Sequence, residues 1–133
     1  MLASACSAPM LGDFPINEVE VGGESLTVAV ATRPEELHRG LRAVNELPAG
    51  VDGMLFVFES PRPGTFTMED TLIPLDIWWF DESGVMYDST TMTPCVTSPC
   101  PVYPSPNVIG WALETPAGER VFEVGDELTM PGS

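Results

Sequence analysis

The feature that most constrains the fold is a run of apolar residues in the middle of the chain. The segment 53–58 reads Gly-Met-Leu-Phe-Val-Phe, so apolar side chains occupy consecutive positions. Neighbouring side chains of a strand point to opposite faces, and this run therefore predicts a central strand that is covered on both sides. A second run, at 75–80, places Leu75, Ile77 and Trp79 on one face of a strand and Asp76, Trp78 and Phe80 on the other.

Alternating residues predict further strands around these two runs. Val19 and Val21 alternate with glutamates in a strand that begins at Ile16, and a Gly-Gly turn leads into a strand at 26–30. Other strands are expected at 85–87, 108–114, 121–124 and 127–130, the last two as a short hairpin around Gly125-Asp126.

One helix is predicted after the second strand. The segment Thr32–Glu35 has the form of a capping box with proline near the first helical position. Leu37, Leu41 and Val44 then repeat with helical spacing, so the helix is expected to end near Asn45. Gly40 falls inside this helix, and we attribute it to a close approach by another backbone.

Together these elements predict a mainly β (α+β) domain. We expect a curled antiparallel sheet, forming a sandwich or partial barrel of about seven or eight strands, with one short helix. The 133 residues suffice for one domain with its own core. Residues 16–133 are assigned to this single globular domain, and residues 1–15 to a signal remnant or tether.

Charge excludes several kinds of partner. The chain has 20 acidic residues against 5 basic ones, all arginine, for a net charge of −15. Binding to a nucleic-acid backbone depends on cations that displace counterions, so we expect no nucleic-acid partner. The same charge opposes adhesion to anionic lipid, and no run of about 18 apolar residues could cross a bilayer.

The N-terminal cysteine indicates lipidation. Small residues lead into Cys6, as at the end of a bacterial lipoprotein signal whose cysteine becomes acylated. A charged start and an apolar stretch are missing, so we interpret residues 1–5 as a trimmed signal. The alternative is an ordinary N-terminus with a chance cysteine. The lipoprotein interpretation predicts an extracytoplasmic protein that meets the membrane only through its anchor.

The other two cysteines, Cys95 and Cys100, flank a short loop rich in proline. Zinc would need more ligands than these cysteines and the single histidine supply, and a redox pair is more often spaced C-x-x-C. We therefore predict a structural disulfide that fixes the loop. Such a bridge agrees with an oxidising compartment.

Asp76 is the most informative polar residue, because it lies near the start of a strand that is otherwise apolar. Its carboxylate must be paired or hydrogen-bonded, or lie at an open mouth. One interpretation is structural, with Asp76 accepting backbone N–H groups or pairing with Arg39 or Arg42. The other is a carboxylate with a perturbed pKa in a pocket.

Other candidates have structural alternatives as well. Asp70 suits a turn with Thr71, or else shares a cleft with Asp76 as a cation ligand or an acid–base pair. Met68 belongs to a set of methionines that suits core packing better than a soft-metal site. His38, the only histidine, is expected to be solvated, and no catalytic triad can be assembled convincingly.

Four segments carry a family resemblance: 39–41, 53–58, 66–76 and 99–103. In this order they resemble the family named domain of unknown function 192, over about residues 17–130. The resemblance implies a compact, mainly β domain with a short helix, often exported, and it implies no reaction. The chain departs from the family's usual pattern at Thr67, Glu69 and Asp70, where an aromatic, a basic residue and an asparagine are common. Compared with that pattern, the three residues of this chain remove a cation and add an anion beside Asp76.

Three functions remain open. The first is a non-enzymatic, lipid-anchored module of the cell envelope that binds a small ligand or a partner protein, with Met68, Asp70, Asp76 and Tyr103 as candidate ligand contacts. The second is a hydrolase-like enzyme that uses Asp70, Asp76 and perhaps Glu114. The third is a site for a divalent cation, favoured by the charge of −15. We expect a monomer without a cofactor or a resident metal.

Overall fold

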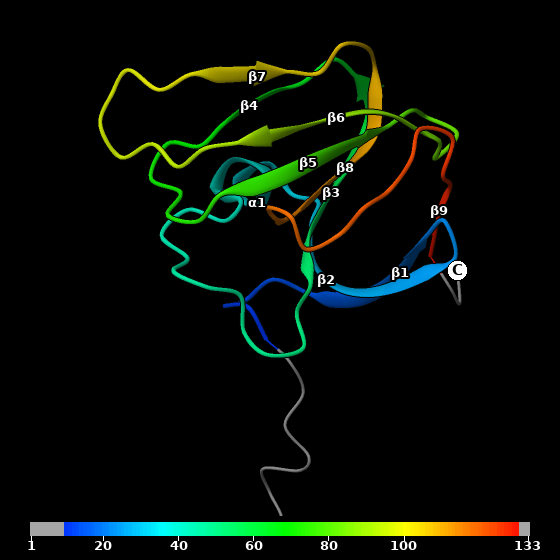
Figure 1. Ribbon diagram of the computed structural model, residues 1–133, viewed down its shortest axis with the longest axis horizontal. Helices are drawn as coiled ribbons and strands as arrows, with labels where there is room; N and C mark the ends of the chain where they lie inside the picture. The colour runs from blue at the N-terminus through cyan, green and yellow to red at the C-terminus, as the bar shows by residue number, and fades with distance from the viewer. Residues whose placement is uncertain (1–9, 131–133) are drawn as a thin grey trace, which may run out of the picture.

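The apolar segments form the inner strands of the sheet. In the computed structural model, which describes residues 10–130, β3 (Gly53–Arg62) and β5 (Leu75–Phe80) lie on either side of β8 (Ile109–Pro116) (Figure 1). Both neighbours run antiparallel to β8. The prediction that these runs are covered on both faces is confirmed, because residues of each are buried in two separate clusters.

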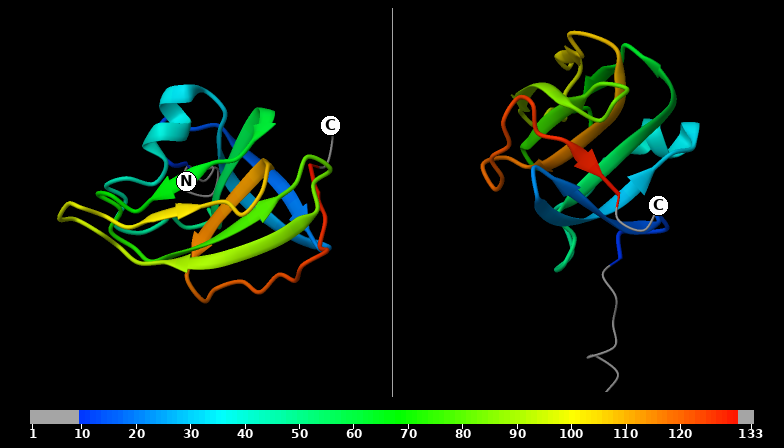
Figure 2. Two further views of the ribbon diagram at one scale, coloured as in Figure 1. Left: turned by 90° about the horizontal axis from the view of Figure 1, so that it is seen from above. Right: turned by 90° about the vertical axis from the view of Figure 1, so that its right-hand side faces the viewer.

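The remaining strands extend the sheet on both sides. Its order is β6-β5-β8-β3-β2-β1-β9, with bounds β1 (Ile16–Val21), β2 (Glu24–Ala31), β6 (Met86–Met92) and β9 (Leu128–Thr129). A second, two-stranded sheet pairs β4 (Thr65–Thr67) with β7 (Val102–Pro104). The seven-stranded sheet curls into a half-barrel, and the views in Figure 2 show this curvature. The predicted class, a mainly β partial barrel with little helix, is confirmed.

One neighbouring pair departs from the predicted antiparallel arrangement. β2 and β3 are parallel, with Val28 opposite Gly53 and Ala31 opposite Phe56. Parallel neighbours cannot be joined by a tight turn, so the chain must cross over between them. The helix lies in this crossover. Sequence periodicity identified the strands and the helix but not the direction in which the strands pair.

The helix is shorter than predicted. α1 spans Pro34–Arg39, with Arg33 rather than Thr32 at its N-cap. The carboxylate of Glu36 accepts the backbone N–H groups of Thr32 and Arg33, at 3.1 and 3.2 Å. These hydrogen bonds and Arg33 lower the pKa of Glu36 to about 2.

Gly40 ends this helix instead of lying within it. Its φ of 50° and ψ of −134° are not helical, and they suit a residue without a Cβ. A Cβ at this position would lie 3.4 Å from the ring of Phe56, so the close approach is to a side chain and not to a backbone. Leu41 follows in non-helical backbone and is still buried, which explains why the helical spacing seemed to continue.

The two faces of the sheet carry separate cores. One contains Ile77 and Trp79 and is joined by Leu41 from the segment after α1 and by Phe66 from β4. The other contains Trp78 and Phe80 together with the apolar residues of β1, β2 and β9. The adjacent tryptophans therefore face opposite ways, as the alternation of a strand requires. In the second core, Trp78 Nε1 donates to Thr115 Oγ1 at 3.1 Å.

The structure differs from the sequence predictions near both ends of the described residues. The predicted hairpin of 121–124 with 127–130 is wrong, because residues 121–127 form no strand and β9 pairs with β1. Residues 11–15, which sequence assigned to the tether, pack on the domain: Leu11 and Phe14 are buried, and Pro15 accepts the N–H of Val30. Within residues 10–130, no helix is long and apolar enough to cross a membrane.

Candidate ligand-binding pocket

A carboxyl group lies on the face of the sheet that carries α1. Glu114, on β8, is paired with Met54 of β3 on one side and with Ile77 of β5 on the other. Cross-strand partners point to the same face, so the glutamate belongs to the apolar face that contains Met54 and Ile77. Glu114 is only 5% exposed. The alternation of side chains along β8 thus places an acidic residue among the apolar residues of this face.

Glu114 faces a cavity of about 390 Å³ instead of packed protein. Aromatic and aliphatic side chains form one part of its walls: Phe56 and Phe58 from β3, Phe66 from β4, Leu37 and Leu41 from α1 and the segment after it, and Met68. Polar side chains complete the lining: His38, Arg42, Arg62, Thr65, Thr67 and Thr71. A pocket that combines apolar walls with polar groups able to orient a ligand is typical of sites for small organic ligands.

The Glu114 carboxyl makes no hydrogen bond or ion pair with any side chain or backbone group of residues 10–130. Removal from water penalises the charged form, and burial raises the pKa of Glu114 to about 8. At neutral pH the group is therefore mainly a neutral acid, with one O–H donor and free acceptor positions. Among residues 10–130, the carboxyl oxygens of Glu114 are not among the fully buried atoms without a partner, so they reach the cavity and can bind a molecule that enters it.

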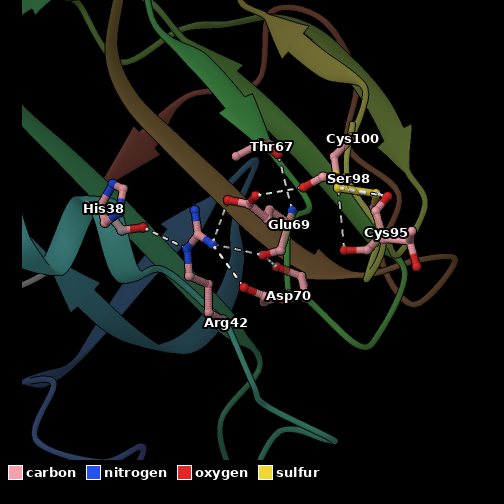
Figure 3. Close-up of polar contacts among 10 residues, drawn as sticks. His38, Arg42, Thr67, Glu69, Asp70, Cys95, Ser98 and Cys100 are labelled. Atoms are coloured by element: carbon pink, nitrogen blue, oxygen red, sulfur yellow. Dashed lines mark hydrogen bonds and ion pairs between the residues drawn. A yellow bond between two sulfur atoms is a disulfide. The ribbon is translucent and has the colours of Figure 1, made fainter.

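Arg42 forms a fixed part of the cavity lining. Its Nη1 donates to the backbone carbonyl and to Oε1 of Glu69, both at 3.2 Å, and lies 3.7 Å from Oδ2 of Asp70 (Figure 3). Its Nε donates to the carbonyl oxygen of His38 at 3.3 Å. Glu69 also accepts the hydroxyl of Ser98 at 3.4 Å, which connects Arg42 to the disulfide loop. The charge of Arg42 is thus met by two carboxylates.

Arg62 is held differently. Its guanidinium lies over the ring of Phe58, 5.0 Å from the centroid, and no carboxylate of residues 10–130 forms an ion pair with it. The other four arginines each contact at least one carboxylate: Arg33, Arg39, Arg42 and Arg120. The cavity is therefore lined by one compensated arginine and one uncompensated arginine.

Met68 is the only one of the four predicted ligand contacts that lines the cavity, and it is fully buried there. Asp70 is exposed, occupies a left-handed turn with φ of 58°, and lies beside Arg42 outside the lining. Tyr103 pairs with Phe66 across the small sheet, and its hydroxyl accepts the N–H of Thr93 at 3.3 Å. The predicted contacts are thus not gathered at one point.

Asp76 has partners inside the fold. Its Oδ1 accepts the hydroxyl of Thr91 at 2.5 Å, and its Oδ2 accepts the N–H of Gly118 at 2.9 Å. These bonds join β5 to β6 and to the turn after β8. Of the two structural partners considered from sequence, the backbone N–H is present, whereas neither Arg39 nor Arg42 contacts Asp76. Asp76 is half-buried and lies outside the cavity lining.

The predicted disulfide between Cys95 and Cys100 is present, with Cα atoms 5.8 Å apart. Cys6 lies outside the described residues. Among residues 10–130, no group of three or more His, Cys, Asp or Glu side chains is arranged to hold a metal ion. Asp70 lies beside Arg42 whereas Asp76 is bonded to Thr91 and Gly118, so the two carboxylates have different partners, and Glu114 is the acidic residue with an unusual environment.

Sequence analysis gave Glu114 little weight, although a signal for it was present. Between Val108 and Thr115 the strand alternates, and Ala112 and Glu114 fall on one face. An acid on the inner face of an apolar strand is costly, so it is a candidate for a functional group. Arg42 and Arg62 had no comparable signal, because their position at the cavity depends on α1 and β4 covering that face.

Comparisons with known proteins agree with this fold. The family model of DUF192, described as "Uncharacterized ACR", matches residues 17–130. A crystal structure of a proposed transcription regulator from Sinorhizobium meliloti 1021 is 25% identical, covers 93% of this chain and 100% of its own, and has a TM-score of 0.79. A protein of unknown function from Novosphingobium aromaticivorans DSM 12444 is 24% identical, covers 97% of both chains and also has a TM-score of 0.79. No curated protein matches the chain.

Replacement of Glu114 by Gln should stabilise the domain in a manner that depends on pH. The pKa is about 8 in the folded chain, against an ordinary 4.5, so between these values the unfolded chain releases a proton that the folded chain retains. The contribution of Glu114 to stability is therefore neutral below about pH 4.5, falls as pH rises, and is constant above about pH 8.

Urea unfolding at a series of pH values should show a gap between Glu114→Gln and the parent chain. This gap should open across that window and reach a few kcal/mol at its alkaline end. Exposed Glu123→Gln is the matched control and should show no such gap. A Glu114→Gln domain that is less stable than the parent chain at every pH would contradict the burial of an unpartnered acid.

Replacement of Asp76 by Ala should lower the free energy of unfolding by about 1–3 kcal/mol, because the hydroxyl of Thr91 and the N–H of Gly118 both lose an acceptor. Asp76→Asn should cost less, since one oxygen remains. Exposed Glu59→Ala is the control in chemical denaturation. An Asp76→Ala domain as stable as this control would show that the two hydrogen bonds contribute nothing.

Proposed function

Because the chain belongs to the DUF192 family, whose members are described only as uncharacterized, we propose a function from the cavity: this domain binds a small organic ligand that contacts Glu114. The observation that carries the proposal is a carboxyl group, 5% exposed and without a partner within residues 10–130, on the wall of an aromatic-lined cavity. A ligand that hydrogen-bonds or pairs with this group would recover the interactions that it lost on leaving water.

The proposal describes a binding domain rather than an enzyme. Nucleophilic catalysis needs a nucleophile, a base and a group that orients the base. Asp70 and Asp76 lie outside the cavity lining, and the Glu114 carboxyl has no hydrogen bond to His38 or to the threonines of the lining. The described residues therefore support recognition of a ligand and no specific reaction.

We place this domain outside the cytoplasm, anchored through Cys6. The small residues before Cys6 support the anchor, and the bridge between Cys95 and Cys100 suits an oxidising compartment. The role ascribed to the Sinorhizobium meliloti protein is not part of the proposal, because a net charge of −15 opposes contact with a nucleic-acid backbone.

Ligand binding can be tested by thermal unfolding in the presence of a library of amines, carboxylic acids, sugars and short peptides. A ligand of the folded domain should raise its stability by mass action, by about 2.7 kcal/mol at a hundredfold excess over Kd. The shift should be reduced in Glu114→Gln and retained in Glu123→Gln. Hits whose shifts are equal in both variants would place the binding site elsewhere and contradict the proposal.

Anchoring predicts a specific mass. When the chain is produced behind a bacterial lipoprotein signal peptide in a bacterial host, the mature protein should begin at Cys6, carry a diacylglyceryl group and fractionate with membranes. Intact-mass measurement checks this, and Cys6→Ser should yield soluble, unmodified protein. A free thiol at Cys6 in the parent chain would contradict the anchor and leave the pocket proposal unaffected.

A further inference from the structure

The unpartnered carboxyl restricts the chemistry of a ligand in this cavity. A neutral ligand needs only hydrogen-bonding groups, which a buried Gln side chain would supply without the cost of ionisation. The property that distinguishes Glu114 is that it can become an anion. An anion that is largely removed from water interacts strongly with a cation placed beside it.

The walls next to Glu114 also suit a cation. Three phenylalanine rings line the cavity, and Phe66 contacts Phe56 and Phe58 edge-on, with centroids 5.7 and 6.4 Å apart. Aromatic rings attract ammonium groups through the negative potential of their faces. A carboxylate together with aromatic walls is a combination that recognises an ammonium group.

The positive groups of the lining restrict the rest of the ligand. The charge of Arg42 is met by Glu69 and Asp70. Although the chain has 20 acidic residues, the guanidinium of Arg62 lies over the ring of Phe58 and forms no ion pair with a carboxylate of residues 10–130. A guanidinium without a carboxylate partner at the cavity is available to bind a carboxylate of the ligand.

We propose that the cavity binds a zwitterionic amine, with its ammonium group on Glu114 and its carboxylate on Arg62. The assignment rests on the proposed function, because it requires that the cavity is a binding site. Simple amines are then not the best ligands, because they have no carboxylate to pair with Arg62. Simple carboxylic acids are likewise not the best ligands, because they leave Glu114 without a partner.

The ionisation of Glu114 gives the proposal a pH signature. With a pKa of about 8, roughly one molecule in ten is ionised at pH 7, so an ammonium ligand binds about tenfold more weakly there than to the ionised form. Alkylammonium groups, like lysine, remain charged to about pH 10. Affinity should therefore rise with pH and level off above about pH 8. The other titratable or charged groups of the lining are His38, Arg42 and Arg62, and His38→Gln separates the histidine from this effect.

Isothermal titration calorimetry with four matched compounds tests the assignment. 6-Aminohexanoate is the zwitterion, and hexylamine, hexanoate and hexanol are its single-charge and neutral counterparts. 6-Aminohexanoate should bind most tightly, with an affinity that rises about tenfold between about pH 7 and pH 9 in the parent chain and in His38→Gln. Shorter zwitterions such as 4-aminobutanoate then measure the span between the two charged groups.

Substitutions of Glu114 and Arg62 test which residue binds each end of the ligand. Glu114→Gln should weaken 6-aminohexanoate and hexylamine at least tenfold and remove the pH dependence. Arg62→Gln should reduce 6-aminohexanoate to the affinity of hexylamine and leave hexylamine unchanged. The matched controls, Glu123→Gln and Arg39→Gln, alter exposed side chains outside the lining and should change neither affinity.

Two outcomes overturn the assignment. If hexanol or hexanoate binds as tightly as the zwitterion, and Glu114→Gln alters that affinity, the cavity binds ligands of another class and the proposed function stands. If none of the four compounds or the shorter zwitterions binds at millimolar concentration, the zwitterion assignment fails, and the proposed function is decided by the broader thermal screen.

Discussion

A sheet whose inner strands are apolar on both faces needs two separate covers, and this requirement determines the rest of the molecule. One face closes through the curvature of the sheet, which brings β1, β2 and β9 around Trp78 and Phe80. The other face cannot close in this way and is covered by α1 and the small β4–β7 sheet. This second cover is assembled from short elements, and it leaves the cavity in which Glu114 is enclosed.

The position of the helix follows from the one parallel strand pair. Since β2 and β3 run in the same direction, the chain must return across a face of the sheet, and α1 lies in that return. The chain continues after Gly40 with Leu41 and Arg42, which contribute an apolar wall and a fixed cation to the cavity. The topology of the sheet and the composition of the pocket are therefore linked.

Sequence analysis predicted the features that depend on local periodicity. The inner strands, the opposite directions of Trp78 and Trp79, the disulfide and the family were all accessible from residue patterns. The parallel pairing and the destination of β9 were not, because alternation specifies which face a side chain occupies and not which strand lies beside it. Asp76 drew attention because it interrupts an apolar strand, yet Thr91 and Gly118 satisfy it. Glu114 interrupts β8 in the same manner, and only the arrangement of α1 and β4 reveals that no group of residues 10–130 bonds to it.

The two arginines of the cavity differ in how firmly they are held. Arg42 is restrained by the end of α1 and by Glu69, which in turn contacts the loop closed by the disulfide. Arg62 is exposed and is restrained by a single ring contact. Arg42 is thus held in place, while the side chain of Arg62 can change rotamer at little energetic cost. In the proposed site, an arginine that changes rotamer can meet the carboxylates of ligands of several lengths, while Glu114 on β8 holds the ammonium end of each.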